Sequence, residues 1–158
     1  MHPALGRYDA RFVVTDPPNG SLERIAADAA PPPRFVVGCF FRSPDQRKAF
    51  LEGLKRTAAL AAIPDRAADL VRDAAMDDAT DAGWLRRIVR TRAQAGLGYH
   101  VYSLRAGVPP YAAGCLISFE PLEPPALARH ADLAREETEV QRRRMLDVFG
   151  LRTDDAAD

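Results

Sequence analysis

An uninterrupted apolar run, RFVVGCFF at residues 34–41, constrains the fold more than any other feature of the chain. In a strand its side chains would alternate between two faces: Phe35, Val37, Cys39 and Phe41 on one, and Val36, Gly38 and Phe40 on the other. Both faces are apolar, so both must be covered. A glycine inside such a run is typical of close approach by another element. The run therefore predicts a central strand of a sheet.

Other segments supply the remaining elements. Alternating apolar residues bounded by turn residues predict strands at 11–15, 99–105 and 111–119, the last two as an antiparallel hairpin. Helical spacing and capping residues predict helices at 22–29 and 44–63, one that begins at Asp65, and two more at 82–95 and 126–149. The order β-α-β-α-α-α-β-β-α predicts an α+β fold. We expect a two-layer sandwich of helices on a roughly four-stranded mixed or antiparallel sheet, with a long C-terminal helix.

The length and the charge of the chain limit the classes of protein to which it can belong. We expect residues 1–152 to form one domain and residues 153–158 to be a frayed acidic tail. Lys and Arg number 22, as do Asp and Glu, and this balance argues against a dedicated nucleic-acid binder. The sequence shows no long apolar span and no signal-peptide pattern. We therefore expect a cytoplasmic protein without a membrane partner, and the arginine- and alanine-rich composition indicates a bacterial source.

The two cysteines, Cys39 and Cys115, each follow a glycine inside an apolar run. If the hairpin places Cys115 opposite Tyr102, His100 lies diagonally on the same face, whereas a shift of one residue moves His100 to the other face. An imidazole beside a thiol is the arrangement that activates a nucleophilic cysteine, so Cys39, His100 and Cys115 are candidate catalytic residues. The interpretation that we favour is that both cysteines are small buried core residues.

A candidate anion site lies where the apolar strand meets the next helix. Ser43 is placed to cap that helix, and its first N–H groups lie beside Arg42. No glycine-rich phosphate loop accompanies them, so the alternative is that Ser43 only caps the helix. The sequence has no C-x-x-C motif and its three histidines are far apart. We therefore expect neither a metal site nor a cofactor.

The stretch WLRRIVRTR places Arg86, Arg87 and Arg90 opposite an apolar helix face. Such a basic face can bind phosphates, and this is the basis of a weaker hypothesis of nucleic-acid binding. We favour the interpretation that these arginines form a solvated surface.

The long last helix is the most informative segment about partners. Its apolar stripe is thin for a helix of about 24 residues, roughly 36 Å long, and no heptad pattern is sustained. The helix could project from the sheet or pair with a second copy, which makes Leu133, Val140 and Arg143 candidate partner-binding residues. We expect His130, in its first turns, to be a surface residue.

No catalytic motif is visible, so the sequence favours a small non-catalytic accessory or regulatory protein. It would act through protein–protein contacts, including contacts with a second copy of itself, or by binding a small ligand. The alternative is a small enzyme with a pocket at the sheet, which uses either a Cys/His pair or an Arg/Ser anion site.

Overall fold

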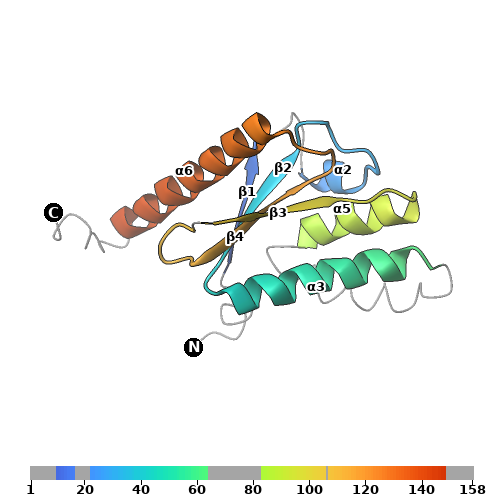
Figure 1. Cartoon of the computed structure of the whole chain (residues 1–158), viewed down its shortest axis with the longest axis horizontal. Coiled ribbons are helices and arrows are strands. Elements are labelled where there is room, and N and C mark those ends of the chain that lie inside the picture. Colours follow the sequence, from blue (N-terminus) through green and yellow to red (C-terminus); the bar gives the residue numbers. More distant parts are fainter. Residues whose placement is uncertain (1–9, 17–21, 64–82, 106, 149–158) are drawn as a thin grey trace.

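The computed structural model describes residues 10–16, 22–63, 83–105 and 107–148 (Figure 1). The strands are β1 (Ala10–Thr15), β2 (Val36–Phe41), β3 (His100–Leu104) and β4 (Ala113–Ser118). The helices are α2 (Leu22–Ala26), α3 (Pro44–Ala61), α5 (Gly83–Gln94) and α6 (Pro124–Val148). The helix predicted from Asp65 and the acidic tail at 153–158 lie outside the described residues.

The strands form one antiparallel sheet in the order β1-β2-β4-β3. β2 and β4 lie in the centre, and all of their residues are buried. This confirms the α+β class and the central position predicted for the apolar run. β1 and β3 form the two edges, and each has hydrogen-bonded strand neighbours on one side only among the described residues.

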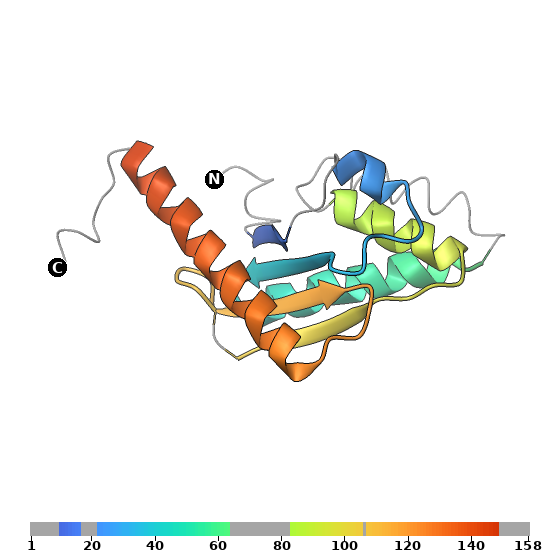
Figure 2. The same ribbon diagram turned by 90° about the horizontal axis from the view of Figure 1, so that it is seen from above.

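Helices cover both faces of the sheet (Figures 1 and 2). On one face, side chains such as Val37, Cys39 and Ile117 belong to a core shared with α2, α3 and α5. On the other face, Val36, Phe40 and Leu116 belong to a core with Ala131 and Ala134 of α6. The described elements thus make three layers, where the element order alone predicted two. Two layers would have left one apolar face of β2 and β4 in water.

Gly38 of β2 is the point where α6 comes closest to the sheet. A Cβ atom added to Gly38 would lie 2.5 Å from the Cβ of Ala134. Two small residues therefore face each other, and the helix backbone approaches the strand more closely than larger side chains would permit. The close neighbour predicted for the glycine is confirmed, and it is α6.

Helix α6 begins at Pro124, two residues earlier than predicted, and runs for 25 residues. Pro124 and Pro125 form the first turn of α6, where a missing N–H group costs nothing. The C-terminal part of α6 extends beyond the strands (Figure 2). Across the described parts of the chain, no helix has both the length and the apolar character needed to cross a bilayer.

Candidate functional site

Cys39 and Cys115 lie directly opposite each other on the paired strands β2 and β4. Both are free thiols and both are fully buried. Burial, followed by the hydrogen bond with Cys115, raises the pKa of the Cys39 thiol well above its usual value. A thiol in this setting stays protonated at neutral pH and is a poor nucleophile. The two cysteines behave as core residues, the interpretation favoured from the sequence.

His100 lies on the other face of the sheet from these thiols. Ser103, rather than Tyr102, is opposite Cys115, and His100 is opposite Ser118. The observed register differs by one residue from the register that would join His100 to Cys115. Because side chains alternate between the two faces along a strand, this shift moves His100 to the face opposite Cys115. His100 is also exposed at the start of β3. The sheet therefore brings the two cysteines together and separates His100 from both.

The proposed anion site at the start of α3 is occupied by the chain itself. The Ser43 hydroxyl accepts a hydrogen bond from the Gln46 N–H at 3.2 Å, and the Gln46 side chain accepts one from the Arg42 N–H at 3.1 Å. The Arg42 guanidinium lies over the Tyr111 ring, 5.8 Å from its centre. Ser43 therefore caps α3 as in a capping box, except that the Gln46 side chain reaches back to the N–H of Arg42 rather than to that of Ser43.

The basic stretch of α5 does not form a uniform solvated face. Arg86 is only 9% exposed, and its Nη1 donates to the Thr57 hydroxyl at 3.4 Å. Its guanidinium carbon lies 5.6 Å from the centre of the Phe50 ring. Arg86 thus packs between α5 and α3, because its planar cation can stack on an aromatic face. The expectation that Arg86 is solvated was wrong, and Arg87 and Arg90 are half-buried.

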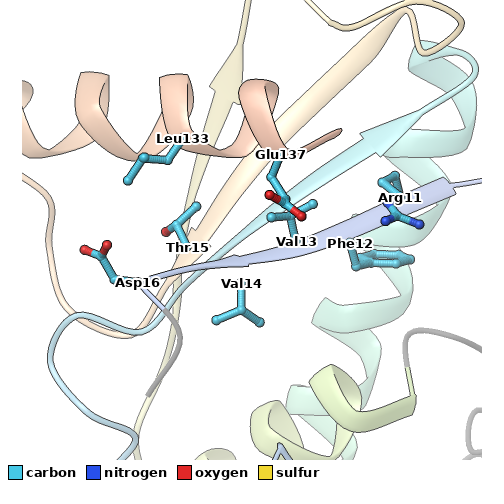
Figure 3. A pocket seen from close by; sticks show the side chains of 8 residues that line it. All are labelled: Arg11, Phe12, Val13, Val14, Thr15, Asp16, Leu133 and Glu137. Carbon is cyan, nitrogen blue, oxygen red and sulfur yellow. The ribbon is translucent and has the colours of Figure 1, made fainter. Parts of the chain in front are cut away.

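An open groove of about 530 Å³ lies between β1 and α6 (Figure 3). Six consecutive residues, from Arg11 at one end to Asp16 at the other, form its β1 side. Leu133 and Glu137, one turn apart on α6, form the other side. The groove therefore combines the edge of a sheet, an apolar helix residue and charges of both signs.

Besides Asp16, the charged residues that line the groove are Arg11 and Glu137. Among the described residues, the Nε atom of Arg11 is buried without a hydrogen-bond partner. The Glu137 carboxylate accepts a hydrogen bond from the Gln141 side chain at 3.0 Å. A buried guanidinium nitrogen without an acceptor costs free energy, so a ligand group that supplies an acceptor would be stabilised there.

His130 and Thr15 hold α6 against β1 beside this groove. The His130 ring is 2% exposed, and its Nδ1 lies 2.6 Å from the Thr15 hydroxyl oxygen. Arginine has only donors, so Arg129 donates to His130 Nε2 at 3.3 Å and the ring proton sits on Nδ1. Nδ1–H then donates to Thr15, whose hydroxyl donates to the Val36 carbonyl oxygen at 3.4 Å.

Charge around His130 favours its neutral form. Burial, and then the neighbouring Arg129, lowers the pKa of His130, and Asp16 opposes this shift in part. Arg129 also forms an ion pair with Asp16 at 2.9 Å. The expectation that His130 is a surface residue was wrong, because α6 turns its ring toward β1, where it contacts Thr15.

The residues suggested for partner binding on α6 fall into different environments. Leu133 is half-buried and lines the groove, and Val140 is half-buried two turns further on. Arg143 is ion-paired at 3.2 Å with Glu139 of its own helix, and Arg142 contacts the same carboxylate at 2.6 Å. These arginines, through the hydrogen bond from Arg142 first, lower the pKa of Glu139.

Sequence reasoning missed Arg11, Thr15 and Glu137 as groove residues. Period-two alternation does place Arg11, Val13 and Thr15 on one face of the first strand. Nothing local indicated that this strand lies at an edge under the last helix. Among the described residues, no three His, Cys, Asp or Glu side chains converge into a metal site.

Comparisons of the chain with protein-family models, with curated proteins and with solved structures found no match. The function is therefore argued from the geometry of the groove alone.

Proposed function

We propose that this chain is a non-catalytic accessory protein that acts by protein–protein binding in the groove between β1 and α6. One observation carries the proposal: five consecutive residues of an edge strand, followed by Asp16, line an open groove whose opposite wall is a helix. A strand that, within the described parts of the chain, has a paired neighbour on one side only is suited to an extended polypeptide rather than to a compact metabolite.

The chemistry of the groove defines the partner segment. Main-chain groups of β1 can pair with an added strand, as in the binding of peptides to sheet edges. Leu133 and Val13 offer apolar contact, while Arg11 and Asp16 stand at opposite ends. The segment that fits is an extended apolar strand with an acidic group at the Arg11 end and a basic group at the Asp16 end.

The enzyme alternative has weaker support from the same contacts. A Cys/His pair needs His100 beside a cysteine, and His100 lies on the opposite face of the sheet. An Arg/Ser anion site needs the Ser43 hydroxyl, which caps α3. We also propose a cytoplasmic location, because adjacent free thiols such as Cys39 and Cys115 are typical of a reducing compartment.

A labelled synthetic peptide that copies residues 10–16 tests the proposal. Its anisotropy is measured while the protein is titrated from nanomolar to high micromolar concentration. We expect binding that weakens at least tenfold in Leu133→Glu, because the substitution places a charge on the apolar wall of the groove. Leu97→Glu, at a position that is 42% exposed in a loop away from the groove, is the matched control and should bind like the wild type.

Two results would contradict this function. One is a protein that remains monomeric throughout the titration and leaves the peptide free. The other is equal loss of binding in Leu133→Glu and Leu97→Glu, since that would place the peptide outside the groove.

A further inference from the structure

Among the described residues, no strand pairs with the outer edge of β1, which is regular and carries a single charge, Arg11. All six residues of β1 pair in a continuous register with β2, without a bulge. The strand contains no proline or lysine, and its middle is Phe12-Val13-Val14. Natural proteins usually interrupt or charge an edge of this kind, because it is a template for another strand. An uninterrupted edge beside a groove is therefore expected to have a partner strand.

The two ends of the groove are complementary to each other. Arg11 stands at one end and Asp16 at the other, with three apolar residues and Thr15 between them. An antiparallel copy of the same strand reverses this order and brings each arginine to the acidic end of its partner. A two-fold symmetric contact requires self-complementarity of this kind.

Face alternation restricts the register of such a pair. A two-fold axis perpendicular to the sheet keeps residues of one face together, so Arg11, Val13 and Thr15 must meet residues of that same set. With Val13 of both copies at the axis, Arg11 lies opposite the partner's Thr15, and the partner's Asp16 follows directly after the strand. Asp16 already pairs with Arg129 of its own chain through one carboxylate oxygen, so its other oxygen is the acceptor for the buried Nε atom of Arg11 in this arrangement.

From these observations we infer that the strand bound in the groove is β1 of a second copy, paired antiparallel about Val13. The inference rests on the proposed function and names its partner. The two sheets join into one continuous sheet, and both α6 helices lie on the same face of it. Leu133 and Glu137 of each copy then flank the new strand pair.

The other edge of the sheet lacks these properties. β3 has the sequence HVYSL, without charges of opposite sign at its two ends. Val101 of β3 is 39% exposed. The groove between β1 and α6 lies at the opposite edge of the sheet. The β3 edge therefore provides a matched control for the β1 edge within the same chain.

Oxidative cross-linking of full-length variants tests the pairing. In Val13→Cys the two introduced thiols face each other across the axis, and directly opposed residues have Cβ atoms about 4.5–5.5 Å apart. We expect covalent dimers at micromolar concentration under mild oxidation. Val101→Cys is the control and should stay monomeric on a denaturing gel. Cys39 and Cys115 are fully buried on the central strands and contribute little background, whereas Val13, although only 7% exposed, lies on an edge strand.

Sedimentation of charge variants provides a second, independent measurement. Arg11→Glu places two acids together at each end of the strand pair, so we expect dimerisation at least tenfold weaker than in the wild type. Lys48→Glu reverses an exposed charge on α3 and should leave the dimer intact. Circular dichroism of both variants shows whether a loss of dimer reflects unfolding.

The outcomes of these experiments distinguish pairing between two β1 strands from the broader proposal that the groove binds a polypeptide. A chain that stays monomeric but binds the residue 10–16 peptide would keep the groove as a binding site and overturn the second copy as its occupant. A dimer that cross-links through Val101→Cys and not through Val13→Cys would overturn the β1 pairing. Cross-linking through Val13 together with weakening by Arg11→Glu would support it.

Discussion

The two faces of the sheet are covered in different ways. The face toward α2, α3 and α5 is sealed by large side chains, including Phe35, Leu54 and Leu85. The face toward α6 uses Gly38, Ala131 and Ala134 at its closest contact. On the first face the helices contribute large side chains, whereas on the second face the large side chains, such as Phe40 and Leu116, come from the strands and the buried apolar α6 residues are small.

This difference has a consequence for binding. Among the described residues, α2, α3 and α5 cover the first face, whereas α6 runs obliquely across the second (Figure 2). The groove lies between α6 and the β1 edge (Figure 3). Polar contacts, above all between His130 and Thr15, hold the helix there. A face covered by a single helix through small residues and hydrogen bonds can therefore remain open to a partner.

The largest effect is expected from truncation of the bulky face. Leu85→Ala removes a fully buried side chain from α5 and should lower the free energy of unfolding by about 2–5 kcal/mol. Leu127→Ala on α6 should cost clearly less, because Leu127 is only half-buried. Urea denaturation of both variants measures these losses in the free energy of unfolding. Equal losses would mean that the two faces depend on side-chain bulk to the same extent.

An intermediate effect is expected at the close contact of α6. Gly38→Ala forces the new Cβ against Ala134 and should cost about 1–3 kcal/mol. Gly98→Ala is the matched control, since an added Cβ there meets nothing within 4 Å. Hydrogen exchange should also rise in α6 more than in α3. A Gly38→Ala protein as stable as Gly98→Ala would refute close packing as the basis of this face.

The smallest effect is expected from titration of His130. Its pKa is lowered in the folded state, so below about pH 6.5 the unfolded chain binds a proton that the folded chain does not. Stability should therefore fall as the pH decreases through that value and be flat above it. His130→Gln preserves one donor and one acceptor and should remove this part of the slope. If the free energy of unfolding of the wild type and of His130→Gln depended on pH in the same way, His130 would not be the group responsible for the slope.

The candidate site was only partly predictable. The alternation of β1 placed Arg11, Val13 and Thr15 on one face, and the thin apolar stripe of the last helix pointed to Leu133. The Cys115–His100 pairing failed by a single residue of register, because the connection between Leu104 and Ala113 is too long to define one pairing from the sequence. His130 was misplaced because the stripe of α6 that packs on the sheet consists of small and polar residues rather than leucines.

The sequence by itself determined the local elements and the two-sided burial of β2. These follow from capping residues, prolines and side-chain alternation, which act over a few neighbours along the chain. Only the tertiary structure decided which strand lies at each edge, which face Arg86 and His130 occupy, and that β1 meets α6 in a groove. Those facts depend on strand order and register, and they are selected by packing between segments more than 100 residues apart, such as Thr15 and His130.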